Sequence, residues 1–217
     1  SAASDVYKRQ EEYQHLAQTL GSSYEIMNLY FKPYTCCRWA HQPIAAGLSL
    51  MRKYGFGPDQ IKEAVVYTFD AAARLSQQIP TETDEAQYNI AYPVAAALVH
   101  GDLGYLQVRE EALQNPAVLD MMKRLKFIVD PVLEAQFPQK RLARIEVTLK
   151  DGTLFRSETF SAPGEATDHV DLAWITEKFR RITSPILETE KQEKLLELLT
   201  SNLEIPVRRI VDFINQQ

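Results

Sequence analysis

The segment 32–41, Lys-Pro-Tyr-Thr-Cys-Cys-Arg-Trp-Ala-His, holds the densest set of chemically reactive side chains in the sequence. Its ten positions carry a lysine, an arginine, a histidine, two cysteines and two aromatic residues. Pro33 fixes one backbone torsion and biases Lys32 toward an extended conformation. Cationic groups between an expected strand (24–34) and an expected helix (41–54) commonly hold a small anion. The alternative is a buried turn without a chemical role.

Each reactive side chain of this segment has a functional and a structural interpretation. The Lys32 ammonium is the best candidate to bind a carboxylate, although a surface lysine is the simpler alternative. Arg38 either clamps a carboxylate with two hydrogen bonds or stacks on Trp39. His41 is a candidate neutral donor, general acid or anion ligand at the start of the helix, or a structural residue. Cys37 and His41 make a poor nucleophilic pair, because no third group orients them.

Composition limits the class of protein. The 217 residues carry a net charge of −5, with 45% hydrophobic and 24% charged residues, which is ordinary for a globular protein. The basic residues are scattered, so we expect no nucleic-acid partner. No apolar run approaches the roughly 20 residues of a membrane span. Because the only two cysteines are adjacent, we expect no disulfide framework and a reducing, cytoplasmic location. Cys36, Cys37 and His41 also lack the number and spacing of ligands that zinc requires.

Hydrophobic periodicity predicts an α+β fold: a small sheet with a hairpin and packed helices, followed by an all-helical C-terminal segment. Asp-Gly between two alternating segments, 142–149 and 153–160, is a strong hairpin signal. We expect domain boundaries near residues 20 and 165, with a leader at 1–20 and a helical segment at 166–217. Further helices are expected at 11–20, 41–54, 86–99, 105–113, 117–125, 170–182, 186–203 and 207–214, and further strands at 24–34, 61–69 and 127–129.

Three motifs in order resemble the MmgE/PrpD family, which includes 2-methylcitrate dehydratase, cis-aconitate decarboxylase and iminodisuccinate epimerase. The first is the segment 32–41 with its lysine, cysteine and histidine. The second is the helix start 87–98, Gln-Tyr-Asn-Ile-Ala-Tyr-Pro-Val-Ala-Ala-Ala-Leu. The third runs from Phe137-Pro138 through the hairpin to Pro163-Gly164 and Lys178-Phe179. The combination is more specific than any one of the motifs, and it covers residue 21 to the C-terminus.

The resemblance implies a lyase or isomerase acting on a small di- or tricarboxylate, most simply a hydro-lyase of the 2-methylcitrate type, without metal or organic cofactor. By resemblance, Lys32, Tyr92 and His41 are catalytic, and Arg38, Gln87 and Cys37 bind substrate. Tyr92 would donate a proton or orient the substrate, or else it is a half-buried aromatic residue. We therefore expect Lys32 and Tyr92 to converge on one anion pocket, since such a reaction needs cations and a positioned acid or base.

The sequence also departs from the family's pattern. Thr35, Asn89 and Ala45 stand where proline, serine and aspartate are common, which puts the substrate and the activity in question, but not the fold. Family members are about twice as long and commonly dimeric, and their N-terminal helical domain supplies further acid and base groups. The chain begins at Ser1 without methionine, so it is either processed or part of a longer protein. If the chain is a part without that N-terminal domain, we expect the chain alone to have little turnover. The alternatives are a non-catalytic binding module of the same fold, or an unrelated α+β protein.

Overall fold

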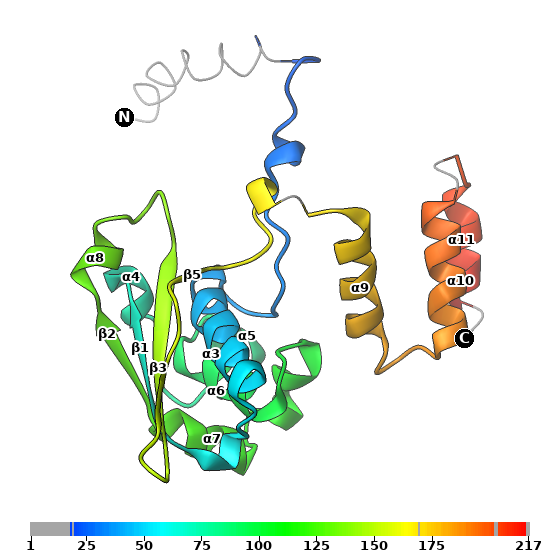
Figure 1. The fold of residues 1–217 in the computed structure, drawn as a ribbon. Coiled ribbons are helices and arrows are strands. Elements are labelled where there is room, and N and C mark those ends of the chain that lie inside the picture. Colours follow the sequence, from blue (N-terminus) through cyan, green and yellow to red (C-terminus); the bar gives the residue numbers. More distant parts are fainter. Residues whose placement is uncertain (1–17, 19, 169, 202–203, 216–217) are drawn as a thin grey trace, which may run out of the picture. The chain divides into compact units, whose positions relative to one another are not determined.

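The computed structural model describes residues 18, 20–168, 170–201 and 204–215 (Figure 1). Contacts divide the chain into two units. The described parts of residues 1–31 and 164–170 form one unit, and residues 32–163 and 171–217 form the other. The helix expected at 11–20 lies mostly outside the described residues. No helix among those described is long and apolar enough to cross a membrane.

The smaller unit joins two segments that are far apart in the sequence. It contains two short 3₁₀ helices, η1 (Glu25–Asn28) and η6 (Ala166–Asp168). The amide of Phe31 donates to the carbonyl of Gly164 at 2.9 Å. Gly164 has a φ of +111°, and a Cβ there would lie 2.1 Å from the Phe31 carbonyl oxygen. Only glycine fits this close backbone approach.

The larger unit is organised around a mixed sheet with the order β2-β1-β3-β4. The central strand β1 (Ile61–Thr68) pairs in parallel with β2 (Leu125–Val129) and antiparallel with β3 (Leu142–Leu149). β3 also pairs with β4 (Leu154–Arg156) and with β5 (Phe160–Ser161). Buried and less buried residues alternate strictly along β3, so one face of this strand lies in the core. The hairpin expected from Asp-Gly is confirmed.

Helices pack against this sheet and against each other. α3 (His41–Tyr54) packs on β3, and α6 (Ala91–His100) packs on α3 and on α7 (Pro116–Lys123) (Figure 1). The α3–α6 approach is close, because a Cβ on Gly47 would lie 2.8 Å from the Leu98 side chain. Shorter elements complete this part: α4 (Asp70–Ala73), α5 (Thr83–Gln87), α8 (Pro131–Glu134) and the 3₁₀ helices η2 (Arg38–Ala40), η3 (Pro58–Gln60), η4 (Tyr105–Gln107) and η5 (Glu110–Ala112).

Three helices follow the sheet: α9 (Leu172–Thr183), α10 (Thr189–Thr200) and α11 (Val207–Asn215). α10 packs on both α9 and α11. The Arg180 guanidinium on α9 forms a bidentate ion pair with Glu193 on α10, at 2.6 and 2.8 Å. The expected α+β class with an all-helical C-terminal segment is thus confirmed.

Three expected elements differ from the structure, one of them the helix expected at 86–99, which is interrupted between α5 and α6. The strand expected at 24–34 is wrong: its first part forms η1, and the described residues after it form no strand. Ile26 and Met27 are 68% and 75% exposed among the described residues, so their apolar side chains are not buried against a sheet there. The helix expected at 105–113 is two separate 3₁₀ turns, η4 and η5.

Candidate functional site

A cavity of about 500 Å³ in the larger unit is the best candidate site. This volume suits a small organic ligand. Its walls come from the segment 32–36, the end of α5, the start of η4, and the face of α9 with the residues that follow it. The lining residues are Lys32, Pro33, Tyr34, Thr35, Cys36, Gln87, Tyr105, Lys178, Ile182, Thr183 and Ile186.

Backbone hydrogen bonds fix the segment that forms one wall. The amide of Thr35 donates to the carbonyl of Leu103 at 3.2 Å, and that of Cys37 donates to the carbonyl of Gln87 at 2.7 Å. The segment is a series of bends, so Lys32 does not sit at the end of a strand as expected. The wall is therefore set by tertiary contacts instead of by a sheet edge.

Lys32 and His41 both interact with one carbonyl of this segment. The Lys32 ammonium donates to the Cys36 oxygen at 3.1 Å, and Nε2 of His41 lies 3.2 Å from the same oxygen. Because a carbonyl only accepts, Nε2 carries the proton. Burial lowers the pKa of His41 to about 4, although the bond to the Cys36 carbonyl opposes this shift. His41 is therefore neutral at physiological pH.

His41 does not line the cavity. Its side chain is fully buried, and its ring packs edge-on against Tyr34 with centroids 5.5 Å apart. In the described structure this residue supports the wall from behind. Its expected catalytic role remains a prediction, and the geometry favours positioning of the Cys36 peptide over direct contact with a ligand.

Lys178 on α9 supplies a second ammonium to the cavity. Burial lowers its pKa, and the positive charge of Arg181 lowers it further. Sequence reasoning missed this residue as a site residue, because it lies on a different element far along the chain. The sequence contained one signal for Lys178, because the pair Lys178-Phe179 belongs to the third motif of the family resemblance.

Tyr105 adds a phenol to the same cavity. Its hydroxyl oxygen is buried and has no hydrogen-bond partner among the described residues. A buried hydroxyl of this kind is costly unless something pairs with it. Tyr105 and Gln87 are thus two residues with polar side chains in the lining of the cavity.

The described structure does not bring Tyr92 to this cavity. Tyr92 is fully buried, and its hydroxyl donates toward the carbonyls of Gln107 at 2.7 Å and Ala112 at 3.2 Å. Burial raises its pKa to about 12. The expected convergence of Lys32 and Tyr92 is therefore not observed, because tertiary contacts direct the phenol toward backbone carbonyls in the core.

Asn89 has a structural role close to Tyr92. Its side-chain oxygen accepts from the amides of Ala91 and Tyr92, each at 2.8 Å. These bonds satisfy two donors at the start of α6, as an N-terminal cap does. Asparagine at this position is thus explained by helix capping.

The remaining predicted residues separate into two groups. Gln87 lines the cavity as expected for a substrate-binding residue, whereas Arg38 and Cys37 are not among the lining residues of the described structure. Trp39 packs edge-on against Phe69 and Phe137, with centroids 5.7 and 6.1 Å apart. Cys37 is a partly exposed free thiol. The roles expected of Arg38 and Cys37 remain predictions.

The lining groups define what the cavity can bind. Its lining includes two lysines, a glutamine, two tyrosines, two threonines and a cysteine, and the described lining contains no carboxylate. Such a set suits a small anion with more than one negative group. Within the described residues, no group of histidine, cysteine and acidic side chains is arranged to hold a metal ion.

The match to a family sequence model places the chain in a known family. The sequence model of the MmgE/PrpD C-terminal domain matches residues 34–203, and the chain belongs to the MmgE/PrpD family. Among characterised proteins it is similar to the cis-aconitate decarboxylase of Mus musculus, with 27% identity over 143 residues. That alignment covers 65% of this chain and 28% of the mouse protein, so the chain spans much less than two thirds of this relative.

Proposed function

We propose that this chain forms the lysine-bearing side of a site for a small di- or tricarboxylate in an MmgE/PrpD-type lyase or isomerase. The observation that carries the proposal is the cavity in which Lys32 and Lys178 both take part. Two ammonium groups hold two carboxylates and stabilise the negative charge that develops when a proton, water or carbon dioxide leaves. Family membership and the similarity to a cis-aconitate decarboxylase support this substrate class.

Within this class, dehydration of a 2-methylcitrate-type substrate and decarboxylation of cis-aconitate are the reactions to test first. The described cavity is lined by two lysines and two tyrosines, but its lining has no carboxylate or histidine to act as a general base. We therefore propose that the 217-residue chain binds such a ligand and has little turnover alone. The alternative is a non-catalytic binding module, which the departures Thr35, Asn89 and Ala45 from the family pattern support.

The test combines binding and turnover on the purified chain. Ligand-observed NMR with cis-aconitate and with 2-methylcitrate should detect binding, and the fully esterified cis-aconitate should not bind. Loss of either compound should be slow or absent in the same samples. No binding of either acid would overturn the polycarboxylate site, and rapid turnover would overturn the proposed lack of activity.

Homodimer formation and a cytoplasmic location are part of the same proposal. Both follow from what is common in the family and from the cysteine usage of the chain, and both can be checked independently of the cavity. Size-exclusion chromatography with light scattering measures the dimer, and fluorescence microscopy of the tagged protein in its host measures the location.

A further inference from the structure

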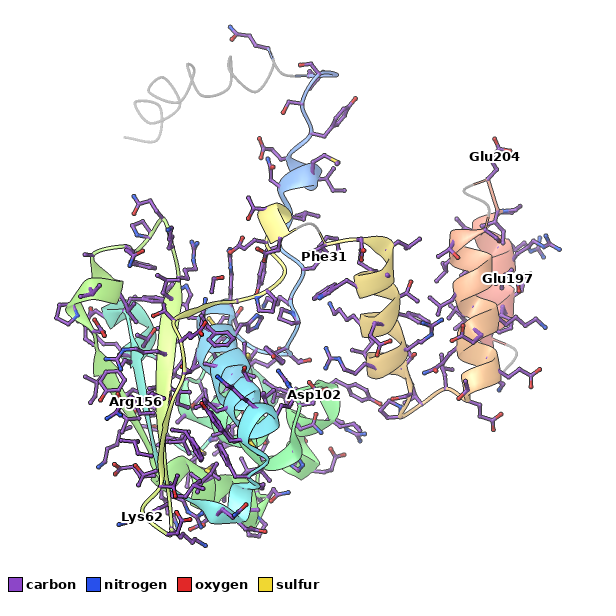
Figure 2. The ribbon with its side chains drawn as sticks, in the orientation of Figure 1. Phe31, Lys62, Asp102, Arg156, Glu197 and Glu204 are labelled. Atoms are coloured by element: carbon purple, nitrogen blue, oxygen red, sulfur yellow. The ribbon has the colours of Figure 1, made fainter. Side chains whose placement is uncertain are left out.

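Arg181 connects α9 to the part of the larger unit that carries the segment 32–36. One nitrogen of its guanidinium forms an ion pair with the Asp102 carboxylate, and another donates to the Pro33 carbonyl at 2.6 Å. Asp102 follows the end of α6 (Figure 2). One side chain therefore holds three separate elements together: α9, the end of α6, and the wall of the cavity.

The position of Arg181 on α9 relates it directly to the cavity. Lys178 and Ile182, which both line the cavity, lie four residues apart and share a helix face, and Arg181 lies three residues after Lys178. The Pro33 carbonyl that Arg181 binds belongs to a cavity residue as well. The bond thus joins the two walls that carry the two ammonium groups.

Other polar side chains of α9 point to a different neighbour. Arg180 pairs with Glu193, and the Thr183 hydroxyl accepts from the Gln192 amide at 2.9 Å, both on α10. Both described bonds of Arg181, in contrast, reach residues before 164. Arg181 and Asp102 are each about one third exposed, so the contact is open enough to break without unfolding the core.

We propose that Arg181 is a positioning residue: through Asp102 and the Pro33 carbonyl it latches α9 against the segment 32–36 and so holds Lys178 opposite Lys32. A guanidinium suits this task because its planar set of donors binds a carboxylate and a carbonyl at once. The existence of the latch is argued only from the contacts of Arg181. Its effect on ligand binding depends on the proposed function.

The experiment measures hydrogen exchange of α9 amides and the Kd for cis-aconitate in the 217-residue chain. Arg181→Gln and Asp102→Asn should each speed exchange in residues 172–183 about tenfold and weaken binding about tenfold, as expected when a charge-assisted hydrogen bond is lost. Arg181→Lys keeps the charge but not the fork of donors, so it should restore part of both effects.

Arg180→Gln is the matched control, since it removes the same charge from the neighbouring position of the same helix. It should leave the exchange of residues 172–178 and the Kd unchanged. The latch is refuted if Arg181→Gln and Asp102→Asn exchange like Arg180→Gln. Its role in positioning Lys178 for a ligand is refuted if exchange rises while the Kd stays the same. If the unaltered chain binds no cis-aconitate, the proposed function fails, and the exchange data still decide whether the latch exists.

Discussion

The Lys32 ammonium and the His41 imidazole share one partner, the carbonyl oxygen of Cys36, at 3.1 and 3.2 Å. The first group lines the cavity, and the second is buried behind it. The shared carbonyl therefore connects the chemistry of the cavity surface to the packing of α3. This hydrogen bond uses one of the three N–H donors of the Lys32 ammonium, so the other donors can bind a ligand.

The buried imidazole predicts a specific dependence of stability on pH. The folded pKa of His41 is about 4, below the ordinary 6.5, so the unfolded chain binds more protons between these values. The stabilisation is complete above pH 6.5 and is lost as the pH falls toward 4. We expect His41 to account for a decrease of about 2 kcal/mol in unfolding free energy between pH 7 and pH 5.

Urea unfolding at the two pH values measures this effect. His41→Gln should be less stable than the unaltered chain at pH 7 and should lose about 2 kcal/mol less on going to pH 5. His100→Gln, at an exposed position, should keep the original pH dependence. Equal pH dependence in His41→Gln and His100→Gln would show that His41 is not buried in its neutral form.

Two tyrosines with different surroundings give a paired prediction. Tyr92→Phe removes a hydroxyl bonded to the Gln107 carbonyl, so it should lower the unfolding free energy by about 1 kcal/mol and leave cis-aconitate affinity unchanged. Tyr105→Phe removes a hydroxyl with no partner among the described residues, so it should change stability by less than about 0.5 kcal/mol. The affinity of the Tyr105→Phe variant for cis-aconitate should fall at least about threefold, as expected for loss of a hydrogen bond of modest net strength. The catalytic role expected of Tyr92 remains a prediction, and the opposite pattern would support it.

Gly164 provides a test of the smaller unit. A Cβ at this position meets the Phe31 carbonyl oxygen at 2.1 Å, and the φ of +111° disfavours any other residue. Gly164→Ala should therefore speed hydrogen exchange of the Phe31 amide at least about tenfold, because strain of this kind amounts to about 1–3 kcal/mol. Gly57→Ala, where a Cβ meets nothing within 4 Å, should leave that exchange unchanged. Unchanged exchange in both variants would contradict the close pairing of Phe31 and Gly164.

Local signals were sufficient for the elements that position the site. The helix α3 was predicted with its observed bounds, because Gly55 adopts the left-handed conformation that ends it. The hairpin was predicted because Asp151-Gly152 specifies a tight turn between alternating segments. The expected strand at 24–34 failed because alternation indicates a strand only where a face is buried, and these residues are largely exposed.

The composition of the site depended on contacts that a single sequence does not contain. Lys32 and Gln87 were predicted and line the cavity, whereas Lys178 and Tyr105 come from separate elements and were missed. Tyr92 was predicted from its motif, but its hydroxyl is used by carbonyls of the 3₁₀ region. Tertiary packing determines which hydrogen-bond donors face a cavity, and the spacing of residues within a motif does not predict it.

We infer that the ammonium groups of Lys32 and Lys178 bind carboxylates in one cavity. Calorimetric titration of cis-aconitate into the chain, Lys32→Met, Lys178→Met and the control Lys62→Met tests it most directly. Lys62 is exposed on β1, near the hairpin end of the sheet (Figure 2). We predict at least about a tenfold loss of affinity for each cavity variant, as expected for a charge-assisted hydrogen bond, and none for Lys62→Met. Equal affinity in all four proteins would show that these two ammonium groups do not bind the ligand.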